Sequence, residues 1–143
     1  MTGFEIPTEF GYVIFGQVAA FITLQYLGGK VMAARKKYQV TYPDMYTTDP
    51  AKEDFNCVQR GHQNALETYP SFIVFNVLAG LRHPIPAAVF GITWCVGRIA
   101  FMKGYSTGKP DQRYSYGGHL HLLSLLGSII LSGHLALNLL GYL

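Results

Sequence analysis

The apolar residues of this chain fall into four long stretches, which are separated by polar segments that contain proline and glycine. The first stretch, Phe10 to Gly29, holds no charged residue and is long enough to cross a bilayer as a helix. With the flanking residues that can continue each helix, the pattern predicts helices at about residues 9–37, 55–81, 87–105 and 116–140. We therefore expect one all-α domain over residues 1–143, an integral membrane four-helix bundle with four transmembrane helices per subunit.

Two of the predicted helices carry polar groups that lipid does not accommodate. In the second helix only the part from Thr68 to Leu81 is free of charge, and this part is too short to cross a membrane. In the third helix, Arg98 stands inside an apolar run. Because a charged side chain in the bilayer interior costs about 3 kcal/mol or more, we expect both regions to face protein.

The composition agrees with a membrane protein. Of the 143 residues 50% are hydrophobic and 13% are charged, whereas soluble domains carry about 25% charged residues. Cys57 and Cys95 form neither a disulfide framework nor a metal-ligand spacing, so we expect both to be packing residues. The first ten residues hold Glu5 and Glu9 but no lysine or arginine, and we therefore expect the first apolar segment to be retained.

The 11 basic residues are distributed unevenly among the predicted connections. Only Arg82 lies beside the second connection, and the two terminal segments hold none. The others lie in the first and third connections or in the helix regions beside them: Lys30, Arg35, Lys36, Lys37, Lys52, Arg60, Arg98, Lys103, Lys109 and Arg113. Because basic residues concentrate on the cytosolic side, this pattern predicts cytosolic first and third connections and both termini on the opposite side.

The candidate site is a polar face near the start of the second helix. Arg60, Asn64 and Glu67 stand at positions i, i+4 and i+7, which places them on one helix face over about 10 Å. Such a face at the mouth of an apolar helix is typical of a functional site. An intramolecular Arg60–Glu67 ion pair, which contributes little energy, explains the same residues, and the three residues alone do not separate the two interpretations.

Arg35 and Arg113 are predicted to lie at the same membrane surface as Arg60. Three basic elements from different parts of the chain are therefore expected at one depth, and a binding site is one interpretation of them. Binding to lipid headgroups is the alternative, and it accounts for other basic residues of this surface, namely Lys30, Lys37 and Lys52. It does not account for the amide and the carboxylate of the second helix.

The remaining chemistry-bearing residues predict no further site. His119 and His121 are two residues apart and face different directions on a helix, so we expect no metal site. His134, on an apolar helix, is expected to be a hydrogen-bonded packing residue. The basic residues are not interleaved with an aromatic platform, and we expect no nucleic-acid binding.

Three segments of the chain resemble the MAPEG family of membrane glutathione enzymes in residue types and in spacing. They are Ala34–Pro43, Phe55–Glu67 and Gly104–Arg113, and the resemblance extends over essentially the whole chain. It implies a homotrimer of four-helix subunits in which glutathione, as co-substrate, binds between adjacent subunits near the cytosolic face. It implies no metal.

The resemblance also implies roles for individual residues of the glutathione site. Arg60, Asn64 and Glu67 match the glutathione contacts of the family's second helix. Arg35 matches an arginine that reaches a glutathione carboxylate from a subunit boundary. His62 stands where the leukotriene C synthase of the family has a glutamine at this boundary.

For the chemical step, the resemblance implies Arg113, which matches an arginine placed beside the thiol, and Tyr105, which matches a tyrosine of the site. Tyr69 is a further candidate for glutathione binding, because it adjoins a position where the synthase has a tyrosine. Three residues depart from the synthase pattern: Thr68 and Phe101 replace tyrosines, and Lys36 replaces an arginine. These departures weaken any inference of the synthase's lipid specificity.

The function implied by the resemblance is that of a membrane glutathione transferase and peroxidase acting on lipophilic electrophiles or lipid hydroperoxides, with leukotriene-C-synthase-like conjugation included. The implied location is the endoplasmic reticulum membrane, with the mitochondrial outer membrane as the alternative. A non-catalytic lipid-binding scaffold and an accessory subunit of a larger membrane complex are the other interpretations. A complete set of glutathione-site residues argues against the scaffold.

Overall fold

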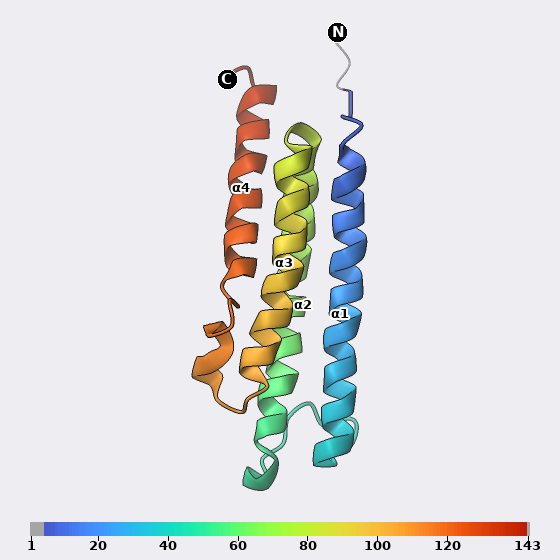
Figure 1. The fold of residues 1–143 in the computed structure, drawn as a ribbon, viewed down its shortest axis with the longest axis vertical. Coiled ribbons are helices and arrows are strands. Elements are labelled where there is room, and N and C mark those ends of the chain that lie inside the picture. Colours follow the sequence, from blue (N-terminus) through green and yellow to red (C-terminus); the bar gives the residue numbers. More distant parts are fainter. Residues whose placement is uncertain (1–4, 143) are drawn as a thin grey trace.

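Four long helices lie side by side in the computed structural model, which describes residues 5–142 (Figure 1). They are α1 (Phe10–Tyr38), α2 (Asp54–Arg82), α3 (Pro84–Tyr105) and α4 (Leu120–Leu139), with the short 3-10 helices η1 (Pro50–Lys52) and η2 (Pro110–Tyr114) in the first and third connections. Successive helices run in opposite directions, so α1 begins and α4 ends at one end of the bundle, and both long connections lie at the other (Figure 1). The predicted all-α four-helix architecture is confirmed.

Two predicted helix starts are wrong. α3 begins at Pro84 rather than at residue 87, and a single residue, His83, separates it from α2. Proline is well suited to the first turn of a helix, where its missing N–H has no intrahelical partner. α4 begins at Leu120 rather than at residue 116. Gly117 has a φ of 88°, a left-handed conformation that a right-handed helix does not pass through.

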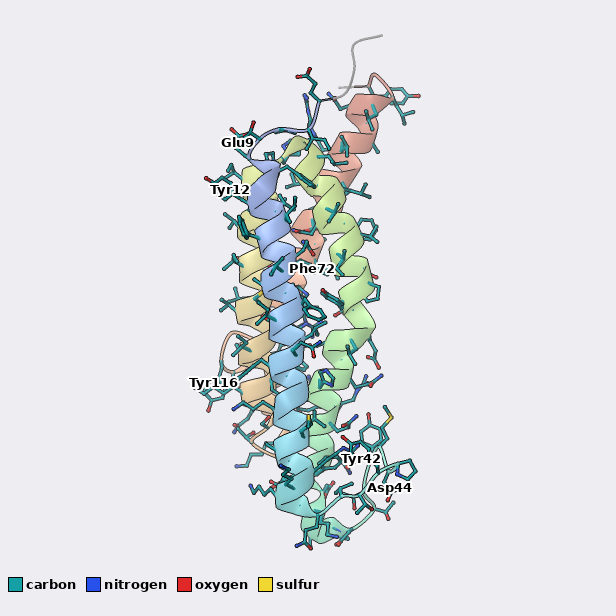
Figure 2. All side chains as sticks on the ribbon, turned by 90° about the vertical axis from the view of Figure 1, so that its right-hand side faces the viewer. Glu9, Tyr12, Tyr42, Asp44, Phe72 and Tyr116 are labelled. Carbon is teal, nitrogen blue, oxygen red and sulfur yellow. The ribbon has the colours of Figure 1, made fainter. Side chains whose placement is uncertain are left out.

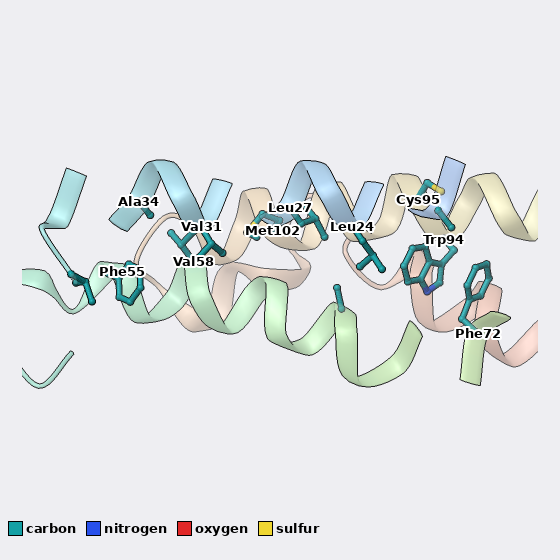
Figure 3. Packing of buried hydrophobic residues seen from close by; sticks show 13 residues of the cluster. Leu24, Leu27, Val31, Ala34, Phe55, Val58, Phe72, Trp94, Cys95 and Met102 are labelled. Carbon is teal, nitrogen blue, oxygen red and sulfur yellow. The ribbon is translucent and has the colours of Figure 1, made fainter. Parts of the chain in front are cut away.

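The core lies where α2 and α3 pack against each other and against both flanking helices, α1 and α4. Figure 3 shows its apolar residues, among which Phe72 and Trp94 stack with their ring centroids 4.6 Å apart. Large apolar side chains such as Phe15 and Ile130 instead lie on the outer surface, where they are 74% and 61% exposed. An apolar exterior around a packed interior is the arrangement that a lipid environment stabilises.

Among the described residues, α1, α3 and α4 are each long and apolar enough to cross a membrane. α2 is as long as α1, with 29 residues, but its first half is polar. Because α2 packs against the three other helices, they shield part of this polar half, as expected from the sequence.

One buried asparagine connects all four helices. Asn76 of α2 accepts a hydrogen bond from Nε2 of Gln17 of α1 at 2.6 Å. Its own amide nitrogen donates to the carbonyl of Ala87 in α3 at 2.9 Å and to the hydroxyl of Ser128 in α4 at 3.2 Å. Hydrogen bonds of this kind stabilise helix contacts in a membrane, where no water competes for the polar groups.

Candidate functional site

Arg60 and Glu67 form an ion pair on the outer side of α2. Nη1 and Nη2 of Arg60 donate to Oε1 and Oε2 of Glu67 at 2.6 and 3.1 Å. The two side chains are 40% and 43% exposed. The intramolecular pair considered from the sequence is therefore present. Because it is open to its surroundings, it contributes little to stability, and both charges remain accessible to a charged ligand.

Asn64 makes a different contact from the other two residues of this face. Its Oδ1 accepts a hydrogen bond from Nη1 of Arg98 at 2.8 Å, while Nη2 of Arg98 contacts the hydroxyl of Thr68. Arg98 is 1% exposed, so the expectation that this α3 arginine faces protein is confirmed, and its partners belong to α2 of the same chain. A buried arginine thereby positions Asn64 beside the Arg60–Glu67 pair.

A hollow of about 270 Å³ lies on one side of α2, at the end that holds the long connections. It brings Arg60 together with Tyr105 of α3. Its other lining residues are Tyr46, Glu53, Asn56, Cys57 and Pro110. The Tyr105 ring is held by edge-on contact with Phe101, the centroids being 5.5 Å apart. We refer to this hollow as the Arg60 hollow.

A second hollow, of about 390 Å³, lies between α1 and α2 and contains Arg35 and His62. Arg35 donates to the carbonyl of Asp44 at 2.8 Å, and its guanidinium lies 4.3 Å from the centroid of the Tyr42 ring. These contacts hold the arginine at the end of α1 and beside the first connection. We refer to this hollow as the Arg35 hollow.

The structure therefore divides the sequence-predicted residues between two hollows. Arg60 and Tyr105 line one, Arg35 and His62 line the other, and no residue lines both. Within one chain, the positive groups predicted to bind one ligand do not converge on a common cavity.

Arg113 lies in η2, where its Nη1 donates to the carbonyl of Pro110 at 2.8 Å. Pro110 lines the Arg60 hollow, but Arg113 itself does not. Asp111 is a neighbour of the guanidinium at 3.9 Å. The predicted catalytic arginine is thus beside the hollow and held by its own connection.

Two glycines allow this connection to pack against α3. A Cβ atom at Gly104 would collide with the carbonyl of Gln112, and a Cβ atom at Gly118 would collide with the carbonyl of Arg113. Only a residue without a side chain permits such an approach. The position of η2 therefore depends on both glycines.

The other candidates pack inside the bundle. The ring of Tyr69 lies against Trp94 with the centroids 5.6 Å apart, so it does not share a hollow with Arg60. Cys57 and Cys95 are buried free thiols, as predicted. His134 forms a 2.9 Å hydrogen bond with His83, which confirms its predicted packing role.

Sequence reasoning missed several polar residues around the two hollows. Tyr46 and Asn56 line the Arg60 hollow, and Gln59 lines the Arg35 hollow. Asn56 and Gln59 had a sequence signal, since both lie in the segment Phe55–Glu67 that resembles the MAPEG family. Tyr46 comes from the first connection, whose course no periodic pattern predicts.

A four-helix bundle with an apolar exterior, three of whose helices are long and apolar enough to cross a membrane, defines a class, the polytopic α-helical membrane proteins. The sequence profile of the MAPEG family matches residues 13–134 of this chain. Microsomal glutathione S-transferase 2 of Homo sapiens is 34% identical over 108 residues, which cover 73% of this chain and 71% of the relative. The protein of the same name from Bos taurus is 30% identical over the same shares of both chains. The chain belongs to the MAPEG family.

Proposed function

We propose that the protein is a membrane glutathione transferase, which joins the glutathione thiol to lipophilic electrophiles. The observation that carries the proposal is the exposed Arg60–Glu67 pair, whose arginine lines a hollow together with Tyr105. Glutathione has two carboxylates, an ammonium group and a thiol. Arginine suits a carboxylate, glutamate suits the ammonium group, and a phenol donates a hydrogen bond to sulfur. The names of the related transferases support the same substrate.

The complete site is proposed to form between subunits of a homotrimer. Arg35 and His62 lie on another side of α2 from the Arg60 hollow, which supports their acting on glutathione held by a neighbouring subunit. Arg60, Glu67 and Asn64 would then hold the ligand from one subunit. Tyr69, which packs against Trp94, would support this wall rather than contact the ligand directly.

The chemical step requires the thiolate, because the neutral thiol is a poor nucleophile. A free thiol has a pKa of about 8.5, so only a few per cent is ionised near neutral pH. We propose that Arg113 stabilises the thiolate by its fixed positive charge, with the hydroxyl of Tyr105 as a second donor. The thiolate sulfur then forms a bond to the electrophilic carbon, and the leaving group departs with the electron pair of its own bond.

A peroxidase activity is proposed as the second reaction of the same thiolate. The thiolate attacks the terminal peroxide oxygen, the O–O bond breaks, and the lipid alkoxide takes up a proton. A second glutathione thiol then attacks the sulfur of the sulfenic acid, an S–S bond forms, and hydroxide leaves and takes up the proton of this thiol. Two thiols are thus oxidised to a disulfide while one hydroperoxide is reduced to an alcohol and water.

We propose that the long connections face the cytosol and that both termini face away from it, in the endoplasmic reticulum membrane. The concentration of basic residues at the end with both connections supports this orientation. We also propose that the protein belongs to the type 3 branch of the family, because of the residue types and spacing in Ala34–Pro43, Phe55–Glu67 and Gly104–Arg113. The relatives named above are type 2 proteins.

The proposal is tested on purified protein with bound glutathione, by following thiolate absorbance in the ultraviolet as a function of pH. Arg113→Ala should raise the pKa of the bound thiol and lower the rate of conjugation, and Arg113→Lys should recover only part. Tyr105→Phe tests the second donor. If the titration of the bound thiol is unchanged in Arg113→Ala and shifted in Tyr105→Phe, the tyrosine rather than the arginine stabilises the thiolate. Absence of thiolate in the wild type at neutral pH would favour the scaffold.

A further inference from the structure

A third hollow, of about 350 Å³, lies between α1 and α3 at the end that holds the long connections. None of its six lining residues is acidic: they are Tyr26, Lys30, Ile99, Met102, Lys103 and Ser106. Two lysines from different helices therefore border one hollow without a carboxylate beside them. The proposed glutathione site uses none of these residues.

Each of the two lysines lies over a tyrosine ring. Nζ of Lys30 is 5.1 Å from the centroid of Tyr26, and Nζ of Lys103 is 4.7 Å from the centroid of Tyr116. Both tyrosines are exposed, and Figure 2 shows Tyr116 on the same side of the bundle as Tyr12 but farther from the end at which α1 begins. Tyrosines are enriched at membrane–water interfaces, so the lysines and their rings indicate that this hollow lies at the depth of lipid headgroups.

Apolar residues follow the two lysines along α1 and α3, away from the long connections, and we refer to this row of residues as the apolar path. Its residues recur every three or four positions on both helices: Ala19 and Ile22 on α1, and Ile92, Val96 and Ile99 on α3. Ile22, Val96 and Ile99 are exposed. The path ends at an apolar groove of about 880 Å³ between the same two helices. From Lys30 to Ala19 the helix rises about 16 Å, roughly half the thickness of the hydrocarbon core.

We propose that this hollow binds the headgroup phosphate of an anionic phospholipid from the leaflet that the long connections face. The phosphate lies between Lys30 and Lys103, and an acyl chain follows the path between α1 and α3. The charge of the two lysines complements the net negative lipid, and the exposed apolar path complements its chain. The inference is independent of the proposed glutathione chemistry.

The test titrates purified protein in neutral detergent with phosphatidylserine and, separately, with phosphatidylcholine of the same acyl chains. Native mass spectrometry counts the bound lipid. We expect phosphatidylserine to bind about tenfold or more tightly than phosphatidylcholine, since each lysine near an anionic headgroup contributes on the order of 1 kcal/mol. The double variant Lys30→Gln/Lys103→Gln should lose this preference, and Lys30→Arg/Lys103→Arg should keep it.

The matched control is Lys37→Gln/Lys109→Gln, which removes the same charge at the same end of the bundle but outside the hollow. It should retain the preference for phosphatidylserine within about twofold, because neither Lys37 nor Lys109 lines the hollow. If both double variants lose the preference for phosphatidylserine equally, the proposed site is overturned, because the basic surface then attracts anionic lipid without a specific hollow. Circular dichroism of all variants confirms that the bundle is folded.

Two further measurements distinguish a bound phospholipid from two other occupants of the hollow, a free anion and a second copy of the chain. Inorganic phosphate at millimolar concentration should not displace phosphatidylserine; displacement together with binding of phosphate alone would assign the hollow to a free anion. Oxidation of an Ile99→Cys variant should give no disulfide between chains, because lipid covers this face. Efficient cross-linking would show that a second copy covers it and would overturn the proposal.

Discussion

At the scale of single residues, the contrast between Arg60 and Arg98 shows how exposure changes the role of an arginine. Arg60 has a carboxylate partner and is partly exposed, so ligand charges can compete for it. Arg98 is buried against Asn64 and Thr68, and it positions neighbouring residues. Both are basic residues of the same membrane end, and only their surroundings distinguish them.

Removing either member of the exposed pair should weaken glutathione binding much more than it weakens the fold. For Arg60→Gln and Glu67→Gln we expect at least about tenfold lower affinity, which corresponds to about 1.4 kcal/mol. Loss of an exposed ion pair should lower the free energy of unfolding by at most about 1 kcal/mol. Titration calorimetry and thermal unfolding measure the two effects.

Arg82→Gln is the control for this pair, because Arg82 is an exposed arginine at the other end of α2. It should leave the affinity for glutathione unchanged. If both pair variants bind glutathione as tightly as the wild type, Arg60 and Glu67 only stabilise the helix surface.

We expect His83 to make the stability of the bundle depend on pH. It lies between α2 and α3 and hydrogen-bonds His134 of α4 at 2.9 Å. Burial, followed by the proximity of His134 and Arg82, lowers the pKa of His83 below its ordinary value of 6.5. A base whose pKa is lowered by folding binds fewer protons in the folded state. Its stabilising contribution is therefore complete above the ordinary pKa of 6.5 and is lost as the pH falls toward the lowered pKa of the folded state.

We therefore expect the Tm of the wild type in detergent to fall as the pH is lowered from about 7 toward 5.5. His83→Asn should remove part of this fall. His119→Asn, which replaces an exposed histidine, should retain it. The same pH profile in all three proteins would show that His83 does not contribute.

At the scale of elements, the third connection depends on how closely it approaches the end of α3. A Cβ atom at Gly104 would collide with the carbonyl of Gln112, so Gly104→Ala must displace the segment that carries Arg113. We expect about 1–3 kcal/mol lower stability. The conjugation rate should also fall, because Arg113 moves relative to the Arg60 hollow.

Gly133→Ala is the matched change, because a Cβ atom there meets nothing within 4 Å. Alanine has the higher helix propensity, so this variant should be as stable as the wild type or more stable by up to about 1 kcal/mol. Thermal unfolding and conjugation rates of the two variants are compared. Equal behaviour would show that η2 does not need its close contact with α3.

At the scale of the whole molecule, the separation of Arg35 from the Arg60 hollow predicts sites shared between subunits. Arg35→Ala and Arg60→Ala homo-oligomers should both be inactive. Co-expression of the two variants should restore part of the activity, because some interfaces then contain both arginines. The measurement is the conjugation rate of mixed oligomers purified through two different tags. Inactive mixed oligomers would place each complete site within one subunit.

The sequence by itself determined the number of helices, their alternating direction and the end of the bundle at which each arginine lies. These properties follow from hydropathy along the chain, because each apolar stretch must satisfy its own backbone hydrogen bonds as a helix. The i, i+4, i+7 spacing also predicted that Arg60 and Glu67 share a face, and the structure confirms their pairing. The predicted starts of α3 and α4 were less accurate. They depend on the local backbone conformation at Pro84 and Gly117, which hydropathy does not report.

Only the tertiary structure decided which residues of different helices meet. Periodicity predicts the face of a helix but not its partner, because the partner depends on how neighbouring helices rotate and pack. Asn64 therefore contacts Arg98, a residue 34 positions away, and Asn76 connects all four helices. The same packing places Arg35 and Arg60 in separate hollows, although both lie at one end of the bundle.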